Sequence, residues 1–235
     1  MRAFAGNSFE DYYDHAMRDF PLPARLVCAA LVRVVWAFTK LVWPWRIEGA
    51  ERLCADGRGR VIVMNHESML DPVALVCELW MRGVHVRPVY KSEFDGVPLA
   101  SCLFSRVGAL PVSRGTADMK MVRRARAALQ RGECVLIYPE ATRVKRDADS
   151  EVHGGFALMA QLAKVPVQPV AIIGARHLRL RSHVAIRVGE PVEWDELPEG
   201  SRKERVAAME REGMRRVWEL RDALRADNPG MEQDR

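Results

Sequence analysis

The feature that most constrains the fold is a short apolar run that ends abruptly in polar residues. Val61-Ile62-Val63-Met64 is rich in β-branched residues and is followed by Asn65-His66 and then by Asp71-Pro72. Such a pattern predicts a buried strand, a loop and the start of a helix, with Asp71 as the N-cap and Pro72 in the first turn. We expect polar chemistry to lie in the loop between the strand and the helix.

The alternation of short apolar runs and helical stretches continues along the chain. Glycines at Gly83 and Gly132 are expected to end two of the helices. Alternation of this kind predicts an α/β fold with a mostly parallel central sheet flanked by helices. Strands are expected at 45–48, 61–64, 86–90, 109–112, 134–138, 167–172 and 184–188, and helices at 71–82, 98–105, 116–131, 156–164 and 199–226.

Composition limits the classes of protein and partner. A chain of 235 residues with 49% hydrophobic content can build one sizeable core. The formal net charge of +5 favours anionic partners such as phosphate groups, anionic lipid or an acidic carrier. No zinc-finger, basic-region or RNA-binding motif is present, so no nucleic-acid partner is expected. The five cysteines form no Cys-x-x-Cys pair, which indicates neither a disulfide framework nor a metal cluster.

The first 45 residues predict two helices that differ in character. Residues 8–20 carry aromatic residues at helical spacing, and residues 24–45 form a longer apolar run interrupted by Arg25, Arg33 and Lys40. These cations argue against a membrane-spanning helix and favour one that lies in the membrane interface, with Trp36 and Trp43 at its boundary. An ordinary core-packing helix is the alternative. We therefore expect a membrane-interface segment at 1–45, an α/β domain at 46–195 and a C-terminal helix and tail at 196–235.

His66 and Asp71 have the spacing of a general-base pair. A carboxylate bound to one imidazole nitrogen fixes the tautomer, which leaves the other nitrogen free to accept a proton from a hydroxyl. Such a base contributes roughly 10²–10⁴-fold in rate. The alternative is structural, with Asp71 only capping a helix and His66 only lying in a loop.

Further polar residues follow other expected strands. Lys91, Arg114 and Glu140 come after strands that should run parallel to 61–64, so they should gather with His66 at one edge of the sheet. Tyr138-Pro139-Glu140-Ala141-Thr142-Arg143 brings a carboxylate, a hydroxyl and a guanidinium together, and the planar guanidinium suits phosphate oxygens.

Two basic stretches remain. The helix expected at 116–131 is rich in arginine, and residues 176–181 read Arg-His-Leu-Arg-Leu-Arg. A solvated charged face is the default interpretation of both stretches. An anionic carrier or membrane surface is the alternative.

Taken together, these motifs resemble those of the PlsC-like glycerolipid acyltransferase family over about residues 45–190. Asn65-His66 through Asp71 is similar to the family's Asn-His-x-x-x-x-Asp motif. Lys91 and the segment 108–114 resemble the second motif. Pro139 through Arg143 resembles Pro-Glu-Gly-Thr-Arg, with Ala141 in place of glycine, and residues 165–170 resemble the fourth motif.

The resemblance implies transfer of a fatty acyl group from acyl-CoA or acyl carrier protein to the hydroxyl of a lysophospholipid at the cytoplasmic face of a membrane, where the protein would be peripheral or monotopic. It implies His66 as the base and Asp71 as its orienting partner, with Asn65 and Ser68 beside the substrate. Lys91, Arg114 and Arg143 would bind the acceptor phosphate, and Glu140 and Thr142 would shape that pocket. No cofactor or metal is expected. Alternatives are a lyso-lipid acceptor without glycerol phosphate, such as a lyso-ornithine lipid, a thioester hydrolase, and a non-catalytic membrane-binding module.

Overall fold

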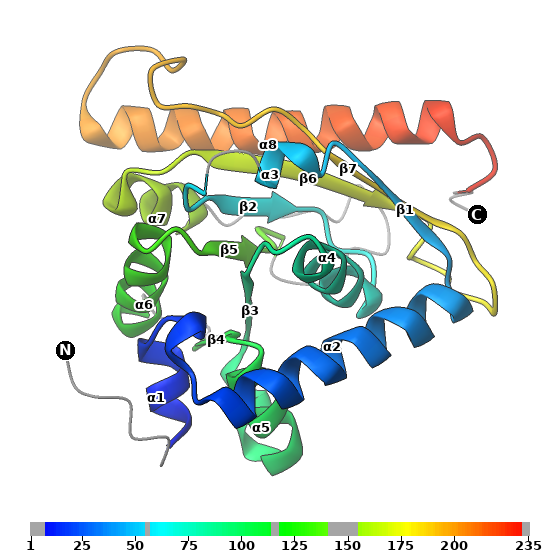
Figure 1. Ribbon diagram of the computed structural model, residues 1–235. Coiled ribbons are helices and arrows are strands. Elements are labelled where there is room, and N and C mark those ends of the chain that lie inside the picture. Colours follow the sequence, from blue (N-terminus) through cyan, green and yellow to red (C-terminus); the bar gives the residue numbers. More distant parts are fainter. Residues whose placement is uncertain (1–7, 55–56, 114–117, 141–154, 232–235) are drawn as a thin grey trace.

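A seven-stranded sheet organises the chain in the computed structural model, which describes residues 8–54, 57–113, 118–140 and 155–231 (Figure 1). The strand order is β1-β7-β6-β2-β5-β3-β4, and every neighbouring pair is parallel except β6 and β7. The expected mostly parallel α/β fold is confirmed. The strands are β1 (Trp45–Glu48), β2 (Val61–Met64), β3 (Val86–Lys91), β4 (Leu110–Val112), β5 (Cys134–Ile137), β6 (Val167–Ile173) and β7 (Val184–Val188).

Helices cover both faces of the sheet. Residues of α4 and α3 join one apolar cluster with the side chains of Ile62 and Met64, and residues of α6, α7 and α8 join another with Val61 and Val63. This division follows from the alternation of side chains along β2. The helices are α1 (Phe9–Asp14), η1 (Met17–Asp19), α2 (Leu22–Val42), α3 (Glu51–Cys54), α4 (Leu70–Met81), η2 (Ser92–Gly96), α5 (Pro98–Arg106), α6 (Met119–Gln130), α7 (Gly155–Ala163) and α8 (Arg202–Asp227).

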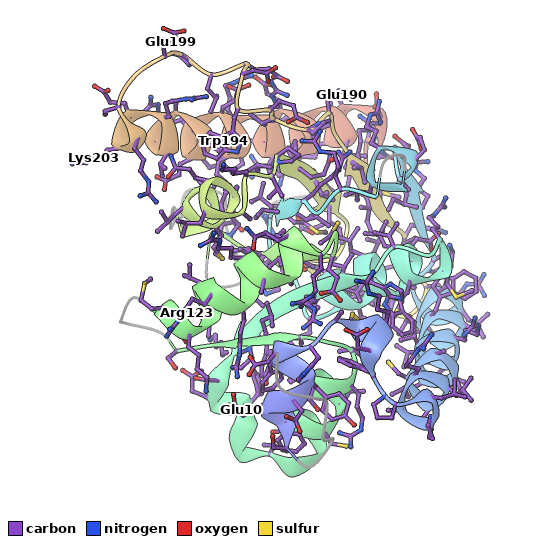
Figure 2. The ribbon with its side chains drawn as sticks, turned by 60° about the vertical axis from the view of Figure 1, so that its left-hand side comes forward. Glu10, Arg123, Glu190, Trp194, Glu199 and Lys203 are labelled. Carbon is purple, nitrogen blue, oxygen red and sulfur yellow. The ribbon has the colours of Figure 1, made fainter. Side chains whose placement is uncertain are left out.

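The C-terminal helix α8 lies along β6 and closes one face of the sheet. Figure 2 shows it crossing this side of the molecule, with Lys203 in its first turn and Glu199 in the preceding loop, both directed outward. Ser201 caps the helix and forms a capping box with Glu204. α8 therefore belongs to the folded α/β unit, because Met209, Met214 and Val217 are buried in its core.

The first helix is shorter than the sequence indicates. The pattern predicts one helix over 8–20, but α1 ends at Asp14 and a short 3-10 turn follows. The fully buried guanidinium of Arg87 on β3 donates to the backbone carbonyls of Tyr12, Tyr13 and His15. Arg87 also pairs with Glu133 at 3.1 Å, and Glu133 accepts the backbone N–H of Met17 at 2.8 Å. α1 is thereby fixed to the core, so only part of the expected membrane-interface segment is free to face a membrane.

The second helix, α2, has an inner face that packs on α4. Its inner residues Cys28 and Val32 contact Cys77 of α4. Trp36 and Lys40 donate to one carboxylate oxygen of Glu78 on α4, at 2.8 and 3.0 Å. The expected placement of Lys40 and Trp36 at the membrane side is therefore wrong, because the buried Glu78 carboxylate draws both inward.

The outer face of α2 is apolar and exposed. Val34 is 66% exposed and Leu41 is 74% exposed, and the other large apolar side chains on this face are Leu22, Leu26, Val27, Leu31 and Phe38. Figure 1 shows α2 running along the outside of the molecule. Among the described residues, no helix combines the length and the apolar character that a membrane crossing requires.

Candidate active site

The loop after β2 and the first turn of α4 bring His66 and Asp71 into contact. His66 lies in the loop after β2, and Asp71 lies in the first turn of α4. Nδ1 of His66 is 2.9 Å from Oδ2 of Asp71. The Asp71 side chain is fully buried, whereas that of His66 keeps 14% of its surface exposed. Nδ1–H therefore donates to the carboxylate, and Nε2 is the nitrogen left for a substrate.

The Asp71 carboxylate is held by the loop that it faces. Oδ2 also accepts the backbone N–H of Glu67 at 2.6 Å and that of Ser68 at 2.8 Å, and Oδ1 accepts the Ser68 hydroxyl at 3.0 Å. Asp71 is not the N-cap that the sequence indicates, because the helix begins at Leu70. The Ser68 hydroxyl instead accepts the backbone N–H of Leu70 at 3.1 Å.

The imidazole of His66 is supported by residues that follow β5. The ring of Tyr138 stacks on that of His66, with 4.1 Å between centroids and 29° between planes. Glu140, which is 4% exposed, accepts the backbone N–H of His66 at 2.8 Å. Burial, and secondarily the charge of Asp71, raise the pKa of Tyr138 well above its ordinary value. Tyr138 is therefore a neutral platform beneath the imidazole, a position that the sequence analysis missed.

Two further residues of the His66 loop bind the end of β6. The Asn65 amide donates to the backbone carbonyl of Ile172 at 2.9 Å and accepts the Ile172 N–H at 2.9 Å. Glu67 accepts the backbone N–H of Ala175 at 3.0 Å and lies 3.7 Å from the guanidinium of Arg176. Asn65 thus extends the pairing of β2 with β6 beyond the strand end, and this contact occupies both ends of its amide.

The predicted phosphate ligands are only partly described. Lys91 is the last residue of β3, and the parallel register of β3 with β5 places it at the same edge of the sheet as Tyr138. Its ammonium makes no ion pair with the described carboxylates. Arg114, Thr142 and Arg143 lie outside the described residues, as does Ala141.

One cavity among the described residues lies away from the His66 loop. A cavity of about 240 Å³ is lined by His85 and Cys134, which lie at the amino ends of β3 and β5, the opposite edge of the sheet from His66. Within the described residues, no group of three or more histidine, cysteine, aspartate or glutamate side chains is arranged to hold a metal ion.

The fold and the site define a class, an α/β protein with a histidine–carboxylate pair at the carboxyl ends of its strands. The sequence profile of the acyltransferase family matches residues 45–173, which include this pair. The chain therefore belongs to the acyltransferase family, in its PlsC type.

Several characterised proteins are similar to the chain. A 1-acyl-sn-glycerol-3-phosphate acyltransferase of Bacillus subtilis is 27% identical over 84% of this chain and 96% of its own length. A lyso-ornithine lipid O-acyltransferase of Pseudomonas aeruginosa is 37% identical, over 35% of this chain and 32% of its own length. The crystal structure of the 1-acyl-sn-glycerophosphate acyltransferase PlsC from Thermotoga maritima covers 84% of this chain and 80% of its own with a TM-score of 0.58, and at 24% identity it supports the fold.

Proposed function

We propose that this acyltransferase moves a fatty acyl group from acyl-CoA or acyl carrier protein to the free hydroxyl of lysophosphatidic acid. The observation that carries the mechanism is the 2.9 Å contact between His66 Nδ1 and Asp71 Oδ2. The similarity to the B. subtilis enzyme over nearly its whole length supports the acceptor.

His66 acts as the general base. Its Nε2 removes the proton of the acceptor hydroxyl while Asp71 holds the ring and stabilises the imidazolium that forms. The acceptor oxygen then attacks the thioester carbonyl, the carbon–sulfur bond breaks, and the leaving thiolate takes the proton from the imidazolium. The Tyr138 ring and the Glu140 bond to the backbone of His66 keep the imidazole in place during both proton transfers. The pathway requires no acyl-enzyme, and the chain contains no Gly-x-Ser-x-Gly segment.

Lys91, Arg114 and Arg143 bind the acceptor phosphate in this proposal. The position of Lys91 at the end of β3, at the same edge of the sheet as His66, supports this role. Its ammonium is a compact positive charge that can bind phosphate oxygens. Glu140 contributes chiefly by ordering the His66 loop, because its side chain is buried and accepts a backbone N–H there.

The outer face of α2 docks on the membrane that holds the acceptor. A helix with one apolar face and cations at its edge partitions into the lipid interface. Leu26, Val34, Phe38 and Leu41 supply the apolar face, and Arg25 and Arg33 lie exposed beside it.

A lyso-ornithine lipid is the second candidate acceptor, favoured by the 37% identity over 83 residues to an enzyme of that name. Initial rates with lysophosphatidic acid and with lyso-ornithine lipid, each with an acyl-CoA donor and an acyl carrier protein donor, separate the two. Preference for the phosphate acceptor, together with a raised KM for it in Lys91→Ala, is the expected result. Turnover of lyso-ornithine lipid alone would reject the first assignment.

The base is tested by His66→Ala. We expect loss of transfer by about 10²–10⁴-fold in kcat. The fold should be retained, because the Asp71 carboxylate keeps the Glu67 N–H, the Ser68 N–H and the Ser68 hydroxyl as donors. His183→Ala, which removes an exposed imidazole near the start of β7, is the matched control and should keep the parent rate. Equal rates for His66→Ala and the parent would exclude His66 as the base.

A further inference from the structure

The loop between β6 and β7, residues 174–183, connects the active site to the outside of the molecule. At its start, Glu67 of the His66 loop accepts the backbone N–H of Ala175 and lies 3.7 Å from the Arg176 guanidinium. The side chains of Glu67 and Arg176 are 1% and 7% exposed. The loop is therefore anchored to the same segment that carries the catalytic histidine.

The far end of this loop is anchored to α2. The backbone N–H of Arg181 donates to the carbonyl of Val42, the last residue of α2, at 2.8 Å, and the Val184 N–H donates to Pro44 at 2.9 Å. Arg181 adopts a φ of 62°, a conformation that non-glycine residues rarely take. Figure 1 shows the yellow loop beside the C-terminal end of α2. The two anchors hold the tip of the loop next to the last turn of α2.

The tip itself consists of one apolar side chain between two cations. Leu180 is 79% exposed, and Arg179 and Arg181 on either side of it are also exposed. The neighbouring Leu178 points the other way and packs against the core cluster beneath α4. On α2, Leu41 is 74% exposed and directly precedes Val42, whose carbonyl accepts the Arg181 N–H, so exposed apolar residues lie on both segments near this contact.

We propose that Arg179-Leu180-Arg181 is a second membrane contact, in which Leu180 enters the acyl boundary and the two arginines bind anionic phospholipid headgroups. The proposal rests on the docking of α2 described above. Arginine flanking an exposed apolar residue fits an anionic lipid surface, because the guanidinium can reach phosphate while its stem stays apolar. Two contacts fix the tilt of the protein, so that the carboxyl ends of the strands, where His66 lies, turn toward the bilayer.

The test is co-sedimentation of the full chain with two kinds of vesicle, pure phosphatidylcholine and an equal mixture of phosphatidylcholine and phosphatidylglycerol. Each basic residue at an anionic surface is worth about fivefold in partitioning, so Arg179→Ser with Arg181→Ser should weaken binding to the mixed vesicles by about 30-fold and leave binding to phosphatidylcholine nearly unchanged. Leu180→Ser should weaken binding to both vesicles by about tenfold.

The matched control removes two exposed arginines elsewhere, Arg123→Ser with Arg126→Ser on α6. Figure 2 shows Arg123 on the side of the molecule away from α2. This control should bind the mixed vesicles as the parent does. An equal loss in the control and in the loop variant would show that net charge, rather than the loop, drives binding, and would overturn the inference.

A second comparison separates this inference from the proposed function. Val34→Ser with Phe38→Ser on α2 should abolish binding to both vesicles. If that variant loses binding while both loop variants keep it, the loop contact is refuted and the docking of α2 stands. If the α2 variant binds like the parent, the docking itself is refuted. Acyl transfer in detergent micelles should persist in every variant, because none touches His66 or Asp71.

Discussion

Ser68 uses its hydroxyl twice within the loop that carries His66, as a donor to Asp71 and as an acceptor from the backbone N–H of Leu70. Ser68→Ala removes both bonds, so we expect a loss of about 1–2 kcal/mol in the free energy of unfolding. Because the altered partner is Asp71, kcat should fall while the KM for the acceptor stays close to that of the parent. Steady-state kinetics with chemical denaturation measure both. A raised KM at constant kcat would instead place Ser68 in contact with the acceptor, as the sequence analysis expects.

The Tyr138 hydroxyl is buried and makes no hydrogen bond among the described residues. An unsatisfied buried hydroxyl costs about 1–3 kcal/mol, so Tyr138→Phe should raise the free energy of unfolding by about 1 kcal/mol and preserve kcat. Tyr138→Ala removes the ring beneath His66 and should lower kcat. Thermal unfolding and initial rates distinguish the two variants. Loss of activity in Tyr138→Phe would assign the hydroxyl a catalytic part.

At the scale of single residues, the sequence predicted the His66–Asp71 pair but not the side chains that hold His66 in place. The spacing of His66 and Asp71 identifies the dyad because both residues lie within one loop-to-helix unit. Tyr138 and Glu140 act through tertiary contacts with a segment more than 70 residues away, which local spacing cannot indicate. Asp71 does not cap α4, because the helix begins at Leu70 and the Asp71 carboxylate already binds His66 and two backbone N–H groups. The Leu70 N–H is bound by the Ser68 hydroxyl, which lies in the loop before the helix.

At the scale of the element, Glu78 fixes α2 to α4. Burial would raise its pKa, but hydrogen bonds from Trp36 and Lys40 and the Lys40 charge outweigh burial and hold the pKa at about 2, against an ordinary value of 4.5. A pKa lowered by folding means that the folded state binds fewer protons than the unfolded state. The contribution of Glu78, about 3 kcal/mol, is therefore present above pH 4.5 and is lost as pH falls toward 2.

Glu78→Gln should lower the free energy of unfolding at neutral pH by about 2 kcal/mol, because Lys40 loses its charged partner. The same variant should flatten the dependence of stability on pH between 4.5 and 2. Denaturation at a series of pH values, read by the fluorescence of the nearby tryptophans, tests both effects. If the free energy of unfolding changed with pH in the same way in variant and parent, Glu78 would not be the source of the acid sensitivity.

Most elements could be predicted because each has its own pattern. The strands 61–64 and 184–188 fall where β-branched residues cluster, and Gly83 and Gly132, with φ of 81° and 85°, follow the ends of α4 and α6. The break after α1 could not be predicted. Its carbonyls bind Arg87, a partner more than 70 residues along the chain, and this replaces the hydrogen bonds of a continuing helix.

At the scale of the whole molecule, the net charge of +5 and the apolar face of α2 should act together. Salt screens charges on exposed surfaces but leaves apolar burial intact. Raising the salt concentration should therefore weaken binding to vesicles that contain phosphatidylglycerol until it equals binding to phosphatidylcholine alone. Co-sedimentation across a salt series provides the measurement. A curve that does not respond to salt would mean that lipid charge plays no part in binding.

The order of the strands in the sheet could not be predicted from the sequence pattern. Alternation of strands and helices indicates parallel pairing, but it does not show that β7 returns antiparallel beside β6 and that β1 then pairs with β7. This return places the end of α2, which leads into β1, at the same edge of the sheet as His66. The proximity of the apolar helix to the active site is therefore a property of the topology.

The hydrogen bonds from α2 to Glu78 also limit how the chain can be shortened to obtain a sample without detergent. A shortened chain that begins at Trp45 would lose the Trp36 and Lys40 donors and leave the carboxylate with Trp45 and Arg82. It would also bring the Cys77 side of α4 into water. Removing the apolar helix α2 would thus replace one exposed apolar surface, the outer face of α2, with another, the uncovered side of α4. Polar substitutions confined to Val34, Phe38 and Leu41 offer the better route to a detergent-free sample.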